Sequence, residues 1–290
     1  MPEGFTPTGI PAWFHDKMLA DRPPATGLGQ SLPARAARLV GSVFRSPMAI
    51  VLFTDFGSQD PYVGQVKAVL ARDAPGVPQV DLLNDVPAYN VRAAAHLLAS
   101  LAPECPQGSV FLSVVDPGVG GPRAPVVVRA GGYRFVGPDN GLLSVFAARA
   151  ADVEAFRIAW RPERLSSSFH GRDLFAPVAA RIAAGTVPRG WLRPAKGLSV
   201  DFGAEDLAEI IYVDHYGNAM TGLRAKRVPR NGKLVVNGES VGGARVFSDV
   251  PEGRAFWYEN SQGLVEIAVN RANAAEKLDL EPGTEVEWAS

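Results

Sequence analysis

SVFLSVVDPGVGGPR, residues 109–123, joins an apolar run to a loop of glycine, proline and charged residues. Residues 109–115 are rich in β-branched side chains, which favour a buried strand. Asp116 stands at the carboxyl end of that strand. In open α/β sheets ligands bind at this edge, because loops there can vary without disturbing the core. The stretch therefore predicts an α/β sheet with polar chemistry at its edge.

A second loop with ionisable side chains, SFHGRD, covers residues 168–173. If both loops reach one crevice, Asp116, Arg123 and His170 meet there. Such a set orients and activates a small nucleophile, which predicts an enzyme. Arg123 would hold Asp116 ionised through a charge-assisted hydrogen bond. Taken alone, each motif also has a plain structural explanation, because glycine and proline form turns and most single histidines are structural.

Outward from these loops, apolar strands alternate with stretches of helical periodicity. We expect strands at residues 49–53, 80–83, 110–115 and 125–129. We expect helices at residues 62–71, 90–101, 141–150 and 174–184, with Gly185 ending the last. This alternation predicts an α/β domain with a largely parallel, Rossmann-like sheet and helices on both faces.

The pattern changes near residue 200. Residues 187–205 are rich in proline and glycine, as in a linker. We expect short strands at residues 209–213, 233–236, 244–247, 264–269 and 285–288, and a hairpin turn at Asn237-Gly238. Short strands at this density predict a small β-barrel or sandwich. The expected boundaries are 1–46 for a poorly ordered N-terminal extension, 47–188 for the α/β domain, 189–206 for the linker and 207–290 for the β-barrel domain.

Composition restricts the partners and the compartment. The 290 residues carry a net charge of −1 and no long basic run, which argues against nucleic acid and anionic membranes. Cys105 is the only cysteine, so internal disulfides and CxxC metal sites are excluded, and a reducing cytoplasm fits best. No apolar run approaches the roughly 18 residues of a membrane span. The proline-broken extension lacks a secretory signal, although residues 34–44 could form a short helix.

Three further motifs admit two interpretations each. Thr54-Asp55-Phe56-Gly57 follows a strand, so Asp55 either caps a helix or accepts the two hydroxyls of a ribose. Neither GxGxxG nor a Walker loop is present, which disfavours a dinucleotide. Residues 214–218 place polar side chains at the end of a strand, or form only a turn. Residues 260–263 are either a plain loop or polar groups that bind an amino-acid head group.

Together the motifs resemble one known family. They are TDFG at 54–57, VVDPGVG with Arg123 at 114–123, GPDNG at 137–141, FHGRD at 169–173, YGN at 216–218 and NSQG…EIAVN at 260–270. In order and spacing they are similar to the adenosine-forming S-adenosyl-L-methionine (SAM) hydrolases. This family is also called the SAM hydroxide adenosyltransferases, and it is related to fluorinase and chlorinase. The resemblance runs from Ile50 to Trp288.

The resemblance implies that the chain hydrolyses SAM by attack of water or hydroxide at C5′, giving adenosine and L-methionine. It implies an α/β domain joined to a C-terminal β-barrel, assembled as a homotrimer with SAM bound between subunits. SAM is then the substrate and the small-molecule partner, and no cofactor or metal is required. Whether the nucleophile is water or preformed hydroxide stays open.

Carried onto this chain, the resemblance makes Asp116, Arg123 and His170 the water-activating triad. Asp55 would accept hydrogen bonds from the ribose hydroxyls, and Asp214 and Ser261 would bind the ammonium and carboxylate of methionine. The expected substrate-binding residues are Asp55, Phe56, Tyr89, Phe169, Gly171, Asp214, Tyr216, Asn218, Ser261 and Asn270. Of these, Tyr89 and Phe169 would form walls, and Tyr216 and Asn218 would contact adenine.

Three alternative functions are open. A halogenase would use chloride or fluoride, but in the halogenating relatives Tyr stands at the position of Asp116 and Ser at that of Gly171. An anionic Asp116 would repel a halide by about 1–4 kcal/mol at 4 Å, so hydrolysis is favoured. A SAM-binding sensor with little turnover is the second alternative. A metal hydrolase using Asp55, Asp116, His170 and Asp173 is the third, although no HxH or HExxH pair is present.

Overall fold

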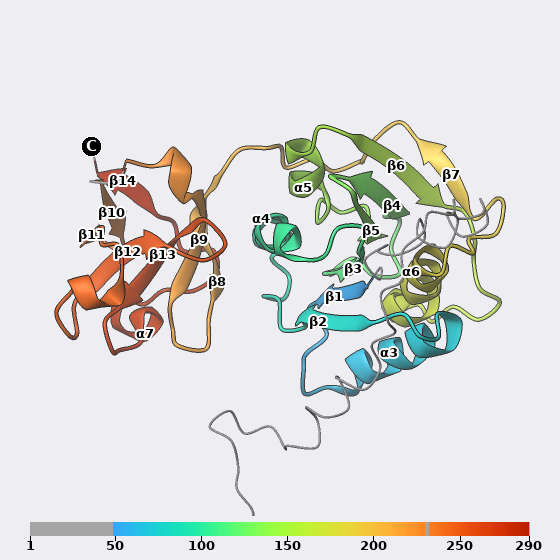
Figure 1. Cartoon of the computed structure of the whole chain (residues 1–290), viewed down its shortest axis with the longest axis horizontal. Helices are drawn as coiled ribbons and strands as arrows, with labels where there is room; N and C mark the ends of the chain where they lie inside the picture. Colours follow the sequence, from blue (N-terminus) through green and yellow to red (C-terminus); the bar gives the residue numbers. More distant parts are fainter. Residues whose placement is uncertain (1–48, 230–231, 290) are drawn as a thin grey trace, which may run out of the picture. The chain divides into compact units, whose positions relative to one another are not determined.

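The structure, a computed structural model, describes residues 49–229 and 232–289. The expected N-terminal extension and the short helix at 34–44 lie outside the described residues. Within the described part, an α/β region precedes a region of antiparallel sheets (Figure 1). No helix of the described residues is long and apolar enough to cross a membrane.

The α/β region is built on a seven-stranded sheet in the order β2-β1-β3-β5-β4-β6-β7. Its strands are β1 (Ile50–Thr54), β2 (Gln79–Leu83), β3 (Val110–Val114), β4 (Pro125–Ala130), β5 (Tyr133–Pro138), β6 (Val153–Ile158) and β7 (Leu192–Ala195). The pairs β1/β2, β1/β3 and β3/β5 are parallel, whereas β4/β5, β4/β6 and β6/β7 are antiparallel. The sheet is therefore mixed, and the prediction of a largely parallel sheet holds for one half only.

The antiparallel half follows from a turn that the sequence interpretation missed. Gly131 and Gly132 join β4 to β5, with φ of +55° and +82°. Two adjacent residues at positive φ form a tight hairpin, and a two-residue hairpin can only join antiparallel strands. Strands β5 and β6 had not been predicted at all.

Helices cover both faces of this sheet, as predicted. Helix α3 (Pro61–Asp73) and helix α6 (Ala176–Ala183) share one apolar core with Ile50 and Leu52 of β1. Helices α4 (Val91–Leu101) and α5 (Ser144–Arg149) share a second core with Val51 and Phe53. The alternation along β1 follows from the period of two that side chains have along a strand. Two short turns complete this region, the 3₁₀ turn η1 (Ala102–Glu104) and the π-helical turn η2 (Gly171–Phe175).

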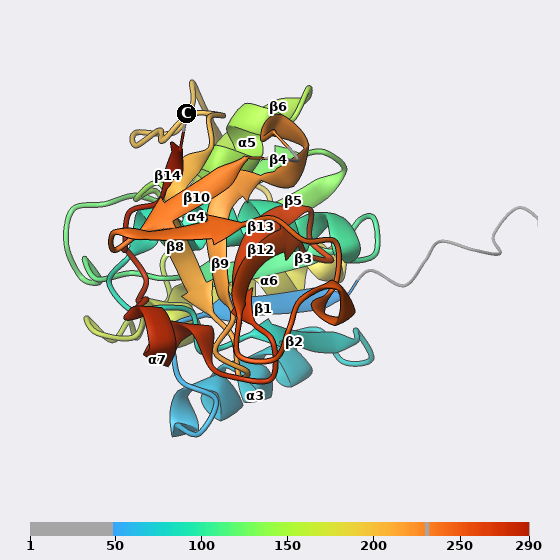
Figure 2. The ribbon, with the colours of Figure 1, turned by 90° about the vertical axis from the view of Figure 1, so that its left-hand side faces the viewer.

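The C-terminal region contains two antiparallel sheets. One has the order β12-β13-β9-β8 and the other the order β11-β10-β14 (Figure 2). The strands are β8 (Leu207–Val213), β9 (Ala219–Arg224), β10 (Lys233–Val236), β11 (Glu239–Gly242), β12 (Ala255–Glu259), β13 (Leu264–Val269) and β14 (Glu287–Ala289). Short helical turns η3 (Ala225–Arg227), η4 (Phe247–Asp249) and helix α7 (Ala274–Leu278) lie between them. Among the described residues, strand pairing does not close these sheets into the predicted barrel.

Two local predictions in this region have different outcomes. The Asn237-Gly238 hairpin is confirmed, since both residues have positive φ and Val236 pairs with Glu239 across the turn. The strand expected at residues 244–247 is wrong, because Phe247 begins the turn η4 instead. Residues 244–246 make only one ladder-like bond, from the Ala244 N–H to the Trp257 carbonyl.

The expected linker also contains a strand. Residues 192–195 form β7, which pairs with β6 alone at the edge of the sheet. Pro194 is tolerated there because an edge strand needs hydrogen bonds on one side only. Beyond this segment, Leu207, Ile211 and Leu264 join the same apolar core as helix α4. The division into domains at the expected boundaries stays a prediction.

Candidate active site

The structure brings Asp116, Arg123 and His170 into contact. The Arg123 Nε donates to both Asp116 carboxylate oxygens, at 3.1 Å and 2.9 Å, and Nη2 also bonds to Oδ2. Arg123 Nη2 lies 3.0 Å from His170 Nδ1. A guanidinium can only donate, so Nδ1 must accept and the imidazole proton must sit on Nε2. We call these three residues the triad.

Two members of the triad are nearly closed to solvent, and His170 is partly buried. The side chains of Asp116 and Arg123 are 4% and 11% exposed, and the Arg123 guanidinium lies 5.3 Å from the centre of the buried Phe175 ring. Burial lowers the pKa of His170, and the neighbouring Arg123 charge lowers it further. His170 is therefore neutral at pH 7, in agreement with the tautomer that its contact with Arg123 requires.

The two loops that carry the triad touch through their backbones. Gly120 has a φ of +79°, and a Cβ built there would lie 2.5 Å from the Ser167 carbonyl oxygen. Only glycine satisfies both the backbone conformation and the close approach. In the second loop the Asp173 carboxylate accepts from the Ser166 N–H at 2.9 Å. That bond fixes the entry to the π-helical turn η2, and π-helical turns are frequent at functional sites.

One cavity, which we call the N-terminal cavity, has a volume of about 600 Å³. No member of the triad lines it, but Phe169 in its lining precedes His170 in the chain, and the Asp116 charge acts on Asp55. The cavity is lined by Asp55, Phe56, Asp60, Tyr62, Gln65, Ser166, Ser168, Phe169 and Arg172. Burial raises the pKa of Asp55 to about 6, and the nearby Asp116 charge adds to the effect. Asp55, Phe56 and Phe169 had been predicted, whereas Asp60 had not. Asp60 stands where a helix cap is expected, but its side chain makes no cap bond to α3 and instead lines the cavity.

Aromatic rings form one wall of the N-terminal cavity and leave no room beside Gly171. Phe169 packs edge-on against Phe56 and Tyr62, with ring centres 5.5 Å apart in both pairs. A Cβ at Gly171 would lie 2.5 Å from Phe56 Cζ. Any larger side chain at this position therefore requires Phe56 to move.

The second cavity, the C-terminal cavity, has a volume of about 640 Å³. Its lining residues are Asp214, Tyr216, Asn218, Phe247, Tyr258, Val269, Arg271 and Ala272. Asp214 Oδ1 accepts from the N–H groups of Tyr216 and Asn218 at 2.9 Å and 2.8 Å, and Oδ2 accepts from Asn218 Nδ2 at 3.0 Å. The turn interpretation of this motif is thus correct, and the turn presents the three predicted residues to the cavity.

The remaining predicted residues lie apart from the triad. Ser261 lines a third cavity, of about 1,110 Å³, next to Asn260 and Gln262. Asn270 Nδ2 donates to the Val250 carbonyl at 2.7 Å, which is a structural role. Tyr89 has a φ of +67° and is 82% exposed. The N-terminal and C-terminal cavities share no lining residue.

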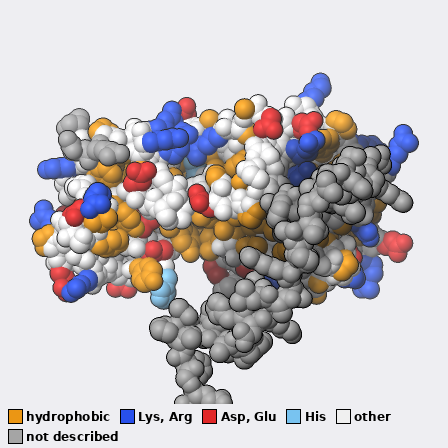
Figure 3. Space-filling view, in the orientation of Figure 1, with side chains coloured by type: hydrophobic (Ala, Val, Ile, Leu, Met, Phe, Trp, Pro, Cys, Tyr) orange, Lys and Arg blue, Asp and Glu red, His pale blue; other side chains and the backbone are white. Residues whose placement is uncertain are grey.

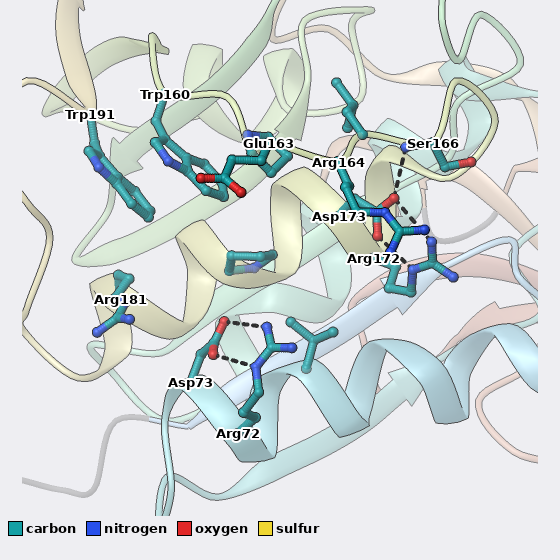
Figure 4. A pocket seen from close by; sticks show the side chains of 14 residues that line it. Arg72, Asp73, Trp160, Glu163, Arg164, Ser166, Arg172, Asp173, Arg181 and Trp191 are labelled. Atoms are coloured by element: carbon teal, nitrogen blue, oxygen red, sulfur yellow. Dashed lines mark hydrogen bonds and ion pairs between the residues drawn. The ribbon is translucent and has the colours of Figure 1, made fainter.

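Another cavity, of about 1,040 Å³, adjoins the second loop; it is lined by Asp173, the fourth residue of the metal-hydrolase alternative, but by none of the predicted catalytic or substrate-binding residues. Figure 4 shows its two ion pairs, Arg72 with Asp73 and Arg172 with Asp173. The indoles of Trp160 and Trp191 stack on its wall with centres 4.1 Å apart. At its wall the Arg172–Asp173 pair and the Ser166 bond hold the loop that carries His170.

Charge and metal-binding groups add two observations. Basic and acidic side chains are interspersed on the face shown in Figure 3. Among the residues that the structure describes, no group of three or more His, Cys, Asp and Glu side chains is arranged to hold a metal ion.

Comparison with known proteins links both regions to one family. Residues 50–190 match the SAM hydroxide adenosyltransferase N-terminal domain, and residues 208–287 match the corresponding C-terminal domain. The (R)-S-adenosyl-L-methionine hydrolase of Thermus thermophilus is 39% identical over 261 residues, which cover 82% of this chain and 98% of the relative. The hydrolase of Salinispora arenicola is 39% identical over 250 residues, covering 80% of this chain and 94% of its own.

A more distant relative and a solved structure are also similar to this chain over most of its length. A fluorinase of Actinopolyspora mzabensis is 24% identical over an alignment that covers 82% of this chain and 95% of the fluorinase. Among solved structures, an uncharacterised conserved protein from Thermotoga maritima superposes with a TM-score of 0.75 at 32% identity. That similarity covers 83% of this chain and all of the Thermotoga chain.

Proposed function

This chain belongs to the SAM hydroxide adenosyltransferase family, and on that premise we propose that it hydrolyses SAM to adenosine and L-methionine. The observation that carries the proposal is the contact of Asp116, Arg123 and His170 beside the N-terminal cavity. Relatives that bear the name of SAM hydrolase match over most of both chains, which supports the same activity here.

The reaction needs a positioned nucleophile and little else. A bond forms between the water oxygen and C5′ while the bond from C5′ to sulfur breaks. The electron pair of the broken bond goes to the sulfonium, which leaves as the neutral thioether of methionine, so no general acid is needed. Holding the reactants in line lowers the activation free energy by up to roughly 7–11 kcal/mol in ideal cases. The water loses one proton, and a positioned base that accepts it raises the rate about 10²–10⁴-fold.

The hydrogen bonds of the triad assign a part to each member. Asp116 is the acceptor for the proton of water, because His170 Nδ1 already accepts from Arg123. His170 keeps its proton on Nε2 and donates it as a hydrogen bond to the oxygen of the nucleophile. Arg123 holds both partners in place and balances the charge of Asp116. The geometry serves an attacking water and a preformed hydroxide equally well.

The substrate would bind across both regions. Asp55 would accept from the ribose hydroxyls, with Phe56, Tyr89 and Phe169 as walls, and Phe56 is packed against Gly171. Asp60 adds a second carboxylate to this cavity. In the C-terminal region Asp214 and Ser261 would bind the amino-acid end, while Tyr216 and Asn218 would hold adenine. Asn270 would support that edge through its bond to Val250.

We further propose a homotrimer in which the N-terminal cavity of one subunit meets the C-terminal cavity of the next. Two proposed stacking residues are largely exposed in the single chain, Tyr89 at 82% and Tyr216 at 74%. Large exposed aromatic side chains mark surfaces that a partner covers. The single Cys105 supports the cytoplasm as the compartment.

Halide transfer is the competing chemistry within the family. Asp116 would repel a halide, and Gly171 has no hydroxyl to hold one. The clash of any Cβ at Gly171 with Phe56 also excludes such a hydroxyl without rearrangement. We expect adenosine as the product in the presence of chloride or fluoride. Formation of 5′-fluoroadenosine or 5′-chloroadenosine in place of adenosine would overturn the assignment.

The deciding experiment incubates the purified full chain with SAM and measures adenosine and methionine, with Asp116→Ala as the matched control. Tight SAM binding with turnover no faster than in that variant would identify a sensor instead. Because the proposed chemistry needs no cofactor, activity should persist in a chelator such as EDTA. Loss of activity in EDTA, restored by a divalent metal, would favour the metal hydrolase.

A further inference from the structure

Glu266 is a buried carboxylate that the mechanism does not use. It lies on β13 and is 2% exposed. Its Oε1 accepts from the Tyr258 hydroxyl at 2.5 Å, and its Oε2 accepts from Asn260 Nδ2 at 2.6 Å. A buried carboxylate is costly unless it is hydrogen-bonded, so its retention in an otherwise apolar strand calls for an explanation.

Each partner of Glu266 belongs to a different part of the proposed substrate site. Tyr258 lines the C-terminal cavity beside Asp214. The charge of Asp214 contributes to raising the pKa of Glu266, after burial, so the two carboxylates lie within electrostatic reach. The Tyr258 ring is held from the other side by Phe247 and Phe256, with centres 5.3 Å and 5.7 Å away.

Asn260 forms the turn that presents Ser261. Its Oδ1 accepts from the N–H groups of Gln262 and Leu264, both at 3.0 Å. Backbone bonds from the Asn260 N–H to the Leu264 carbonyl and from the Ala225 N–H to the Gly263 carbonyl also hold this turn. With both acceptor sites of Oδ1 used inside the turn, Asn260 Nδ2 adds a side-chain bond to Glu266. The carboxylate therefore contributes to the orientation of the Ser261 loop.

We propose that Glu266 is a positioning residue, whose two oxygens fix the Tyr258 wall and the Ser261 loop relative to each other. This inference rests on the proposed function, since Tyr258 lines the same cavity as Asp214, and Asp214 and Ser261 are the residues proposed to bind the amino-acid end of SAM. It predicts that disturbing Glu266 weakens SAM binding and leaves the chemical step at the triad unchanged.

The test uses two variants of nearly the same shape as the native residues. Asn260→Asp keeps the bonds inside the turn but sets a second carboxylate against Glu266, and we expect KM for SAM to rise about ten-fold. Adding Glu266→Gln restores the network. The new amide N–H donates to the carboxylate at position 260, which reverses the native bond from Asn260 to Glu266, and the amide oxygen still accepts from the Tyr258 hydroxyl. In the double variant KM should return to within about three-fold of the native value, with kcat within two-fold throughout.

The control is Thr221→Val, because Thr221 Oγ1 donates to the Val265 carbonyl at 2.7 Å in the same sheet, away from the cavity lining. This variant should lower the Tm and leave KM unchanged. Equal KM values for the native chain and Asn260→Asp, or no recovery in the double variant, would overturn the role of Glu266. Failure of the native chain to form adenosine would instead sink the proposed function.

Discussion

The triad and the C-terminal cavity hold their polar groups in different ways. Asp116, Arg123 and His170 come from two separate loops, are bonded to one another and are shielded by Phe175. Asp214 and Asn218 lie four residues apart on one turn, and the neighbouring Tyr216 is largely exposed. Groups proposed to act on a reacting atom are thus fixed by tertiary contacts, whereas groups proposed to recognise substrate are fixed locally and open to a partner.

The largest effect should come from removing a member of the triad, whose residues are held by tertiary contacts. Asp116→Ala removes the proton acceptor and leaves Arg123 buried without its carboxylate. We expect kcat to fall by about 10²–10⁴-fold with a small change in KM. Steady-state adenosine formation measures both constants. A kcat near that of the native chain would show that the triad does not activate water.

The matched change in the C-terminal cavity, whose polar groups are fixed within one turn, is Asp214→Ala. It removes the acceptor of the turn and the proposed partner of the substrate ammonium, so KM for SAM should rise by roughly 10–100-fold while kcat changes little. Steady-state adenosine formation measures the change in KM and kcat, and calorimetry measures the affinity for SAM. A fall in kcat as large as that of Asp116→Ala would erase the distinction between the two sites.

An intermediate effect should follow from separating the two loops without touching the triad. Gly120→Ala puts a Cβ against the Ser167 carbonyl at positive φ, which should reduce kcat by about ten-fold and lower the Tm. Gly238→Ala, at a positive-φ hairpin position with open space around it, controls for backbone strain alone. Equal loss of kcat in both variants would refute a role for the loop contact.

The smallest effect concerns pH. Because the pKa of Asp55 is raised to about 6, its carboxylate is ionised above that pH and accepts from ribose. Lowering the pH from 7.5 to 5.5 protonates it, so kcat/KM should fall about four-fold. Asp55→Asn should be less active at pH 7.5 and lose this pH dependence. The same variant should be more stable at pH 7.5, since an acid whose pKa is raised by burial destabilises the fold when ionised. An unchanged pH profile in Asp55→Asn would contradict the assignment.

The sequence predicted the strands with an uninterrupted apolar run and missed several others, among them one that contains a glycine and one that contains a proline. Strands β1 and β3 are buried on both faces and are visible as apolar runs. Strand β9 contains Gly222, whose missing Cβ admits the Leu207 backbone and side chain, so its sequence looked like a loop. Strand β7 was hidden by Pro194, which only an edge position allows.

The site shows a similar limit. The spacing of Asp116 and Arg123 indicated an ion pair within one loop, and the structure contains it. The approach of His170 depends on contacts such as that of Gly120 with Ser167, which no local pattern records. Asp60 belonged to none of the motifs singled out in the sequence, and the structure places it in the lining of the N-terminal cavity.

The packing of Gly171 against Phe56 has an evolutionary consequence. If water-using and halide-using relatives descend from one ancestor, a serine at 171 in this background requires the Phe56 ring to shift, because its Cβ would meet that ring. A smaller residue at 56, arising before it or with it, would remove the contact. One aromatic ring therefore favours one order of substitutions over the other when the nucleophile changes.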